Sequence, residues 1–303
     1  MELFSALERE LEERVPSLEL RENEPMSAHT TFRIGGPIRL MALPKTAEEA
    51  VLAVRTAYTM GISPIFLGNG SNLLVADSGV SGFAVKATGL KKLTRQEETV
   101  IAESGVLLSV LASFAREHGL TGLEFAGGIP GSFGGAVTMN AGAYDGEMSK
   151  LITQTVCLTP EGELQYVIGS EHDFSYRHSA FSDGSRMILQ SALVLRQGNP
   201  KEIEETMADL ARRRRSSQPL DLPSAGSVFK RPKGNFAGTL IDSCGLKGTT
   251  VGGAQVSVKH AGFIVNLGGA TCEDVLGLVA YIQKTVLEKT GVSLEMEIKT
   301  LGI

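Results

Sequence analysis

Apolar residues near the amino end of the chain recur every three or four positions, which is the spacing of an amphipathic helix. The stripe consists of Leu3, Leu7, Leu11 and Val15. It predicts a short opening helix that ends at Pro16, because proline cannot continue a helix.

A capping box is indicated by the spacing of Thr46 and Glu49, two residue types that cap the N–H groups at a helix start. A helix is therefore predicted after Thr46, and Gly61 supplies its stop. Extended patterns flank this helix at residues 37–43 and 64–67. We predict a strand-helix-strand unit whose last strand runs into a glycine-rich turn, where α/β proteins tend to bind ligands.

The middle of the chain, residues 75–195, has the pattern of short strands broken by Gly, Asp and Ser. One helix interrupts it over 106–118 and is closed by Gly119. Gln, Gly, Asn and Pro follow one another at 197–200, a combination that neither a helix nor a strand continues through. A further helix is predicted over 201–214.

The carboxyl-terminal part ends in a predicted helix and strand. Thr271 and Asp274 resemble a capping box, and the helix they open stops at Gly291. The final segment alternates between an apolar face and a charged face, which predicts a strand. The apolar face has Leu294, Met296 and Ile298, and the charged face has Glu295, Glu297 and Lys299.

Composition sets limits on the class of protein. With 303 residues, 42% of them hydrophobic, the chain exceeds the usual single-domain size, so two domains are expected. The net charge is −5 and the basic residues are mostly scattered, which argues against a nucleic-acid surface. The one basic run, 212–215, is either a solvated helix end or a phosphate contact.

Neither a membrane span nor a leader is indicated. No run reaches the roughly 18 apolar residues that cross a bilayer, and the first ten residues are acidic and amphipathic. We therefore expect no membrane insertion and a cytoplasmic location. The cysteines are odd in number and far apart, so we interpret them as core residues rather than disulfide or zinc ligands. They are Cys157, Cys244 and Cys272. No metal site is predicted, since His29, His118 and His172 lack a suitable spacing.

Two glycine clusters are the main candidates for ligand binding, because glycine leaves room for a close approach of the backbone. The first, 68–72, can place several N–H groups against a phosphate. The second, 127–135, lacks the Gly-Lys-Ser/Thr ending of a P-loop. Its Gly128, Gly131 and Gly134 do not have the Rossmann spacing either. Each cluster alone is a tight turn or a ligand loop, and two in one domain favour a bound diphosphate.

Five motifs of this chain resemble, in the same order, those of the UDP-N-acetylenolpyruvoylglucosamine reductase family. They are Gly68–Leu74, Gly127–Gly131, Tyr176–Ser179, Ala225–Lys230 and Glu295–Glu297. The resemblance extends from about Thr30 to Gly302. It implies a flavoenzyme that makes UDP-N-acetylmuramate for bacterial peptidoglycan, and hence a role in cell wall biogenesis. About fifty residues separate Arg177 from Ser227, which resembles the shorter, type II form of the family.

The resemblance implies that Ser227 is the proton donor and that Arg177 and Glu297 are the other catalytic residues. Hydride addition to an enolpyruvyl double bond builds negative charge beside a carboxylate, which the guanidinium fork of Arg177 can hold. A serine hydroxyl is a poor acid, so Glu297 or Lys230 has to assist Ser227. Without the resemblance, Arg177 can be interpreted as an ordinary surface arginine and Ser227 as a turn residue. For Glu297 the solvent face of an alternating strand is then the favoured interpretation, since Glu295 and Lys299 share its face. If residues 176–181 are extended, their alternation places Arg177 on the face opposite Tyr176.

The cofactor implied by the resemblance is non-covalent FAD with NADPH as hydride donor, since neither loop offers the histidine or cysteine of covalent members. The expected FAD-binding residues are Gly68, Asn69, Gly70, Ser71, Asn72, Gly127, Gly128, Ile129, Pro130, Gly131, Ser132, Gly134, Asn140 and Gly142. The expected substrate-binding residues are Tyr144, Lys230, Arg231 and His260. The family's longer form has glutamine at the position of His260 and asparagine at that of Arg231.

The expected fold is α+β, with an FAD-binding domain of the vanillyl-alcohol oxidase type followed by an α+β substrate-binding domain. The expected boundaries are a lead-in over 1–26, the FAD-binding domain over 27–197 and the substrate-binding domain over 201–303, with the last strand free to return to the first domain. Two alternatives are another flavin oxidase of the superfamily and a non-catalytic UDP-sugar-binding protein. Small molecules are the expected partners. Neither the oligomeric state nor a preference for NADPH over NADH follows from the sequence.

Overall fold

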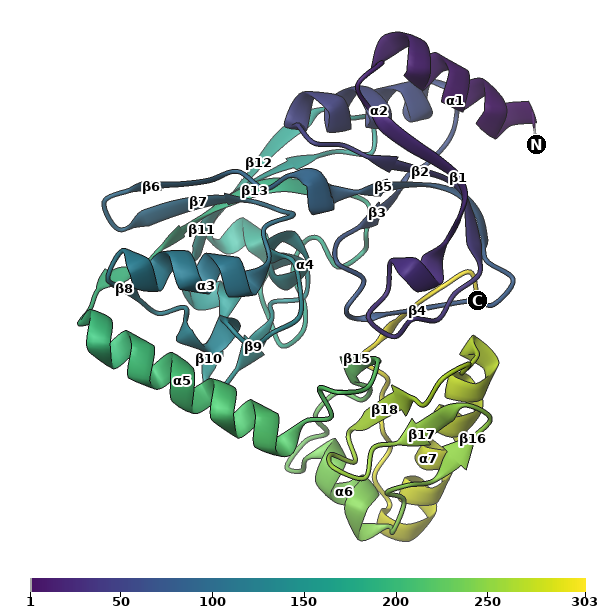
Figure 1. The fold of residues 1–303 in the computed structure, drawn as a ribbon, viewed down its shortest axis with the longest axis vertical. Coiled ribbons are helices and arrows are strands. Elements are labelled where there is room, and N and C mark those ends of the chain that lie inside the picture. Colours follow the sequence, from purple (N-terminus) through teal and green to yellow (C-terminus); the bar gives the residue numbers. More distant parts are fainter. Residues whose placement is uncertain (1) are drawn as a thin grey trace. The chain divides into compact units, whose positions relative to one another are not determined.

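The computed structural model describes residues 2–303, shown in Figure 1. Met1, the first residue of the predicted lead-in, lies outside the described residues. The chain forms two compact units, each assembled from separate segments. Unit 1 comprises the described residues up to Glu24, Arg39–Asn69 and Gly82–Arg212. Unit 2 comprises Pro25–Ile38, Gly70–Ser81 and Arg213–Ile303. The domain boundaries expected from the sequence stay a prediction, and the compact units differ from them by assigning two early segments to unit 2.

The first sheet has the strand order β1-β2-β5-β3, with β3 and β5 parallel. The strands are β1 (Glu19–Pro25), β2 (Pro37–Leu43), β3 (Ile65–Leu67) and β5 (Val80–Lys86). Helices α1 (Glu2–Arg14) and α2 (Ala47–Thr59) cover one face of it (Figure 1). The predicted stripe of α1 supplies buried Leu7 and Leu11, which join apolar side chains of α2, β2 and β5 in one core. The strand-helix-strand prediction is confirmed, although β5 inserts between β2 and β3.

The start of α2 shows how local sequence sets an element. The Thr46 side chain accepts from the backbone N–H of Glu49 at 3.2 Å, as predicted. The Glu49 carboxylate accepts from the N–H of Lys45 at 2.7 Å and from Ser17 Oγ at 2.6 Å. The Glu49 side chain therefore anchors the lead-in segment as well as the helix.

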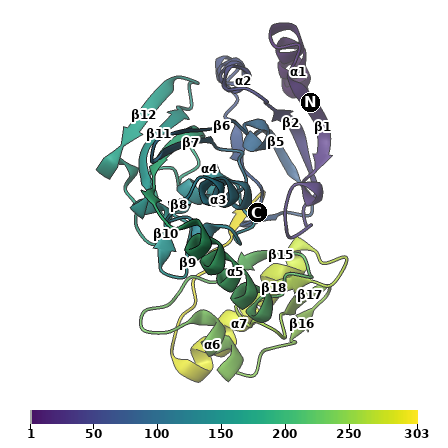
Figure 2. The same cartoon turned by 60° about the vertical axis from the view of Figure 1, so that its left-hand side comes forward.

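A second sheet in unit 1 has the order β12-β11-β13-β7-β6, all antiparallel. Its strands are β6 (Leu93–Gln96), β7 (Thr99–Glu103), β11 (Ile152–Leu158), β12 (Leu164–Ile168) and β13 (Met187–Val194). Helices α3 (Leu108–Glu117) and α4 (Phe133–Thr138) lie against one face of it, as Figures 1 and 2 show. A second core fills the space between them, with Leu111, Phe133 and Leu193 fully buried.

Short elements complete unit 1, except that the 3₁₀ helix Met26–Ala28 and the last residues of α5, 213–217, belong to unit 2. Two small ribbons are formed by β8 (Leu120–Thr121) with β14 (Arg196–Gln197) and by β9 (Gly142–Ala143) with β10 (Gly146–Glu147). Helix α5 (Pro200–Ser217) starts where the turn at 197–200 was predicted and is longer than the predicted 201–214. The single-turn 3₁₀ helices are Met26–Ala28, Ala87–Gly89, Glu124–Ala126, Met148–Lys150 and Gly169–His172.

Unit 2 is built on a sheet of order β15-β18-β17-β16 with two helices. The strands are β15 (Ser224–Ser227), β16 (Thr250–Val251), β17 (Ala254–Val256) and β18 (Phe263–Asn266), and the helices are α6 (Ala237–Ser243) and α7 (Cys272–Thr290). The predicted capping box of α7 is confirmed in both directions, and Gly291 ends the helix at φ 71°. The core of this unit joins α6 and α7 with the sheet and with Phe32, Ile34 and Leu74.

The last strand differs from its prediction. Leu294 and Ile298 are buried, so the apolar face is confirmed. Regular pairing is confined to β19 (Lys299–Leu301), which lies parallel to β4 (Leu73–Val75). Residues 293–298 form only an isolated bridge, Met296 with Phe229, in the short segment that follows β15.

Within the described residues, no helix is both long enough and apolar enough to cross a bilayer.

Asp77 ties the amino-terminal segments of unit 2 to α7. Its two carboxylate oxygens each accept from the N–H of Cys272 at 2.9 Å, and one accepts from Glu273 at 3.3 Å. A carboxylate is favourable there because the first N–H groups of a helix lack partners within the helix.

We therefore expect Asp77→Ala to lower the free energy of unfolding by about 1 to 3 kcal/mol. Urea denaturation followed by circular dichroism measures it. Asp221→Ala, at an exposed loop position of the same unit, is the matched control. Equal midpoints for wild type and Asp77→Ala would show that the helix start does not depend on this carboxylate.

Candidate active site

The first glycine cluster begins directly after β3 and lies against the loop that opens α4. Asn69 Nδ2 donates to the carbonyl of Pro130 at 3.0 Å. A Cβ atom at Gly68 would lie 2.6 Å from Ser132 Oγ, so only glycine permits this approach. The two clusters are therefore in contact within unit 1.

Two buried hydroxyls near this contact lack partners. Ser132 is 1% exposed and Ser104 is 2% exposed, and neither Oγ has a hydrogen-bond partner in the described part of the chain. Ser104 packs behind Gly134, where a Cβ would lie 2.6 Å from the Ser104 Cβ. Since buried polar groups are almost always paired, Ser132 Oγ beside Gly68 is suited to a polar ligand. Ser104 was not predicted, because a lone serine after a strand carries no motif.

The second half of the first cluster belongs to unit 2. A Cβ at Gly70 would lie 2.0 Å from the carbonyl oxygen of His29, and Gly70 has φ 65°. Asn72 Nδ2 donates to the carbonyl of Glu297 at 3.3 Å, and the carbonyl of Asn72 accepts from Lys299 at 3.0 Å. Asn72 therefore fixes the segment that carries Glu297.

Much of the second cluster has a packing role. Ile129 packs against the core beneath α3, and Gly131 accepts from the N–H of Leu108 at 3.0 Å. A Cβ at Gly127 would lie 3.2 Å from Met207 Cε of α5. These contacts lie within unit 1, and the FAD contacts of the second cluster stay a prediction.

Arg177 lies in a tight two-residue turn and not in an extended segment, so the condition for its placement opposite Tyr176 is not met. Ser175 and His178 exchange backbone hydrogen bonds of 3.2 Å around Tyr176 and Arg177. Arg177 has φ 56°, and its guanidinium lies 5.1 Å from the centre of the Tyr176 ring. The two side chains are therefore on the same side of the turn. Arg177 Nη2 donates to the carbonyl of Gly142 at 3.3 Å, which connects this turn to β9.

Tyr144 occupies a second tight turn, between β9 and β10. Tyr144 and Asp145 have φ of 50° and 66°, the positive pair of a type I′ turn. Tyr144 is 41% exposed. The bond from Arg177 to Gly142 places the two hairpins together in unit 1.

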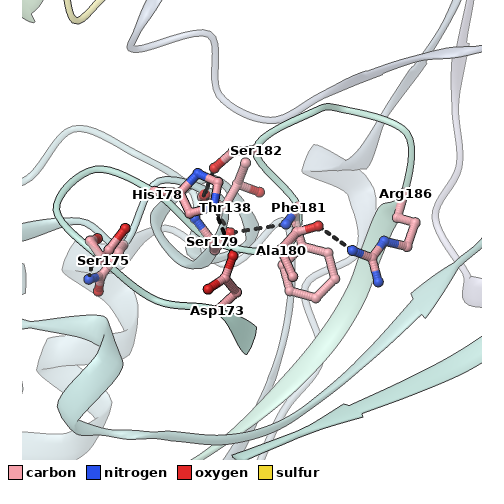
Figure 3. Close-up of polar contacts among 10 residues, drawn as sticks. Thr138, Asp173, Ser175, His178, Ser179, Ala180, Phe181, Ser182 and Arg186 are labelled. Carbon is pink, nitrogen blue, oxygen red and sulfur yellow. Dashed lines mark hydrogen bonds and ion pairs between the residues drawn. The ribbon is translucent and has the colours of Figure 1, made fainter. Parts of the chain in front are cut away.

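The chain after Arg177 is held to the end of α4, as Figure 3 shows. Ser179 Oγ and Ser182 Oγ both donate to the carbonyl of Thr138, at 2.6 Å and 3.0 Å. His178 Nε2 lies 3.2 Å from a carboxylate oxygen of Asp173. Sequence reasoning assigned no role to Thr138, Ser179 or Ser182, because side-chain bonds to a distant carbonyl leave no periodic signal.

Ser227 ends β15 in unit 2, and Glu297 lies beside it. The N–H of Glu297 donates to the carbonyl of Val228 at 2.7 Å, and the N–H of Val228 donates to Gly262 at 2.9 Å. Gly226 has φ 77°, and the strand pairing is irregular between Ser224 and Ser227. The bulge and the positive φ turn the chain at the serine, so it is presented at the strand end.

Lys230 and Arg231 have contacts within unit 2. Lys230 Nζ forms an ion pair with the Glu295 carboxylate, and its backbone N–H donates to the Glu295 carbonyl at 2.8 Å. The Arg231 guanidinium lies 3.9 Å from the centre of the Phe236 ring. The charge of Lys230 is therefore partly compensated.

His260 lies close to Ser227 across Gly262. A Cβ at Gly262 would be 3.0 Å from His260 Cε1 and 3.3 Å from Ser227 Oγ. His260 Nδ1 accepts from the N–H of Gly262 at 3.1 Å, so the neutral ring has its proton on Nε2. Burial lowers the pKa of the His260 imidazole, and the Lys247 ammonium lowers it too. His260 is therefore neutral at pH 7 and offers a donor from Nε2.

Comparison with known proteins identifies the two parts of the chain. Residues 38–167 match the family described as FAD binding domain. Residues 218–301 match the family described as UDP-N-acetylenolpyruvoylglucosamine reductase, C-terminal domain.

Relatives match over nearly the whole chain. A UDP-N-acetylenolpyruvoylglucosamine reductase of Pediococcus pentosaceus is 44% identical over 296 residues, covering 98% of this chain and 99% of its own. That of Caldanaerobacter subterraneus is 46% identical over 280 residues, covering 92% and 93%. The crystal structure of the reductase from Thermus caldophilus is 36% identical, with a TM-score of 0.79, covering 94% of this chain and 98% of that one.

An FAD-binding domain joined to a reductase-specific carboxyl-terminal domain defines a flavin-dependent oxidoreductase, which confirms the predicted α+β fold class. The chain belongs to the UDP-N-acetylenolpyruvoylglucosamine reductase family. The individual site residues stay predictions.

The contact of Gly68 with Ser132 leads to a test of the cofactor site. We expect Gly68→Ala to weaken FAD binding by about 5- to 150-fold. The added methyl group overpacks this contact, which costs about 1 to 3 kcal/mol of binding free energy. The measurement is flavin absorbance per protein after gel filtration, together with FAD released on denaturation. Gly277→Ala, in a helix position with ordinary contacts, should keep its flavin. If Gly68→Ala retained its full flavin content, the contact of Gly68 with Ser132 would not be part of the cofactor site.

Proposed function

We propose that this protein reduces the enolpyruvyl group of UDP-N-acetylglucosamine enolpyruvate, with electrons from NADPH, to give UDP-N-acetylmuramate for peptidoglycan synthesis in the cytoplasm. The observation that carries the proposal is the match to this reductase family along 98% of the chain, through both the FAD-binding and the carboxyl-terminal parts.

The residues around Gly68 fit an FAD. Gly68 and Asn69 bring the first loop against Pro130 and Ser132. The Ser132 hydroxyl is buried and has no hydrogen-bond partner among the described residues. A diphosphate or a flavin carbonyl supplies the acceptor it lacks. We assign these four residues to hold the cofactor non-covalently. Bound FAD, once reduced by NADPH, supplies a hydride to the enolpyruvyl double bond.

Arg177 is proposed to bind the carboxylate of the enolpyruvyl group. Charge that develops at the neighbouring carbon spreads onto this carboxylate, and a guanidinium can donate to both of its oxygens. The bond to the Gly142 carbonyl and the contact with the Tyr176 ring hold the Arg177 side chain in one orientation. Such preorganisation reduces the cost of ordering a long side chain during the reaction.

Ser227 is proposed to give its hydroxyl proton to the carbanion. Because serine is a weak acid, a neighbouring group has to compensate the alkoxide that forms. Glu297 is our candidate for relaying a proton to it, since its backbone is bonded to Val228, the residue after Ser227. Lys230 is the weaker candidate, because its ammonium is paired with Glu295.

The UDP part of the substrate is proposed to contact Tyr144, Lys230, Arg231 and His260. The Tyr144 ring is exposed at a hairpin tip and can pack against a sugar or base. Neutral His260 offers an Nε2 donor, which serves a phosphate oxygen as the amide of a glutamine does.

Ser227→Ala tests the proton transfer. The proton is needed only after the flavin has been reduced, so NADPH should bleach this variant at nearly the wild-type rate. Reoxidation by the enolpyruvyl substrate should be slower by about 100-fold or more. Anaerobic stopped-flow absorbance separates the two half-reactions. Ser243→Ala, exposed on α6, is the control. Equal slowing of both half-reactions would contradict a role of Ser227 in protonation.

Arg177→Lys tests the carboxylate contact. The charge is retained but the planar fork is lost. We expect reoxidation by substrate to slow by roughly 10- to 150-fold, the equivalent of one charge-assisted hydrogen bond of about 1.5 to 3 kcal/mol, while reduction by NADPH is unchanged. Arg14→Lys, at an exposed position of α1, is the control. If Arg177→Lys turned over the substrate at the wild-type rate, Arg177 would not be the carboxylate partner, and residues 212–215 or Arg231 would become the better candidates.

A further inference from the structure

Asn140 lies between α4 and β9, is 2% exposed and has φ 43°. Its side-chain amide is used at both ends. Nδ2 donates to the carbonyl of Ser175 at 3.0 Å, and Oδ1 accepts from the N–H of Ser149 at 2.9 Å. Both partners are backbone groups, so a donor and an acceptor on one short side chain are needed.

The partner at Nδ2 is the residue that opens the Arg177 turn. Ser175 pairs with His178 through two backbone bonds that enclose Tyr176 and Arg177. The guanidinium of Arg177 in turn reaches the carbonyl of Gly142, two residues after Asn140. The segment that starts at Asn140 therefore holds the turn at its base and at the Arg177 side chain.

The other side of the turn is bonded to Thr138, which lies two residues before Asn140. Ser179 Oγ and Ser182 Oγ converge on the carbonyl of Thr138 (Figure 3). Arg177 adopts a left-handed conformation, which a non-glycine residue keeps only where its surroundings fix it. Asn140 and Thr138 provide those restraints on the two sides.

We propose that Asn140 is a positioning residue for Arg177, and not the FAD ligand that its sequence context predicts. The inference rests on the proposed function, because it assumes that Arg177 binds the substrate carboxylate. Asn140 keeps the Ser175 carbonyl in place, and this sets where the guanidinium meets the substrate. An amide is required, since a carboxylate has no hydrogen to donate and an apolar side chain leaves two backbone groups unpaired.

The test uses two variants. Asn140→Asp keeps the acceptor for the Ser149 N–H and loses the donor to the Ser175 carbonyl. Asn140→Gly tolerates the backbone φ of 43° and loses both hydrogen bonds. In each flavoprotein, reoxidation by the enolpyruvyl substrate should slow about 10- to 100-fold. Flavin content and the rate of reduction by NADPH should stay at the wild-type level. Asn23→Asp is the matched control, because Asn23 also has a left-handed conformation, with φ 48°, and lies away from this turn in β1.

A double-mutant cycle separates positioning from general damage. If Asn140 acts through Arg177, then Asn140→Asp should slow the Arg177→Lys variant by less than 3-fold, well below its effect on wild type. Additive effects, or loss of flavin from both Asn140 variants, would overturn the proposal. Failure of the proposed function itself looks different, because wild type would then not be reoxidised by the substrate at all.

Discussion

The parallel pairing of β19 with β4 is the interaction on which unit 2 depends. It joins residues 299–301 to residues 73–75, and Asn72 extends it with bonds to Lys299 and Glu297. Parallel strands cannot be joined by a tight turn, so this pairing brings two distant parts of the chain into one unit. The proposed catalytic Glu297 lies two residues before the paired strand, and Asn72 bonds to its carbonyl.

The first glycine loop makes contacts in each of the two units because of this arrangement. Its first residues, Gly68 and Asn69, approach Pro130 and Ser132 in unit 1. Its last residue, Asn72, holds the Glu297 segment in unit 2. One short stretch of sequence therefore serves the proposed cofactor site and the proposed proton-transfer site. A change in this loop is expected to affect both.

The sequence correctly predicted those elements whose signals lie within a few neighbouring residues. The cap formed by Thr271 and Asp274 and the strand Pro37–Leu43 are encoded within a few positions of each other, so pattern and structure agree. The sequence left open a return of the last strand to the first domain but did not identify the strand that it pairs with, because this pairing joins residues more than two hundred positions apart. Hydrophobic periodicity carries no information about which distant strand is the partner.

The proposed site shows the same division. Ser227 and Gly68 lie in motifs, and the structure gives a local reason for the residue type of Gly68, which approaches Ser132 Oγ. The turn at Arg177 was not predicted, because a left-handed arginine has no compositional signal. The FAD contact expected of Asn140 stays a prediction. Asn140 stands in the stretch Asn140-Ala141-Gly142, which suggests a ligand loop, whereas its side-chain amide bonds to two backbone groups of the same unit.

The β4–β19 pair also governs the order in which the molecule can be made. The cores of unit 1 use residues up to about 207, so they can close while later residues are still being synthesised. Residues 73–75, in contrast, leave the ribosome well over two hundred residues ahead of their partner. Until that partner arrives, β4 and the adjoining glycine loop remain without the strand that orders them. Closing so long a loop is slow in folding, and unit 2 is therefore the part of the nascent chain that stays exposed to misfolding longest.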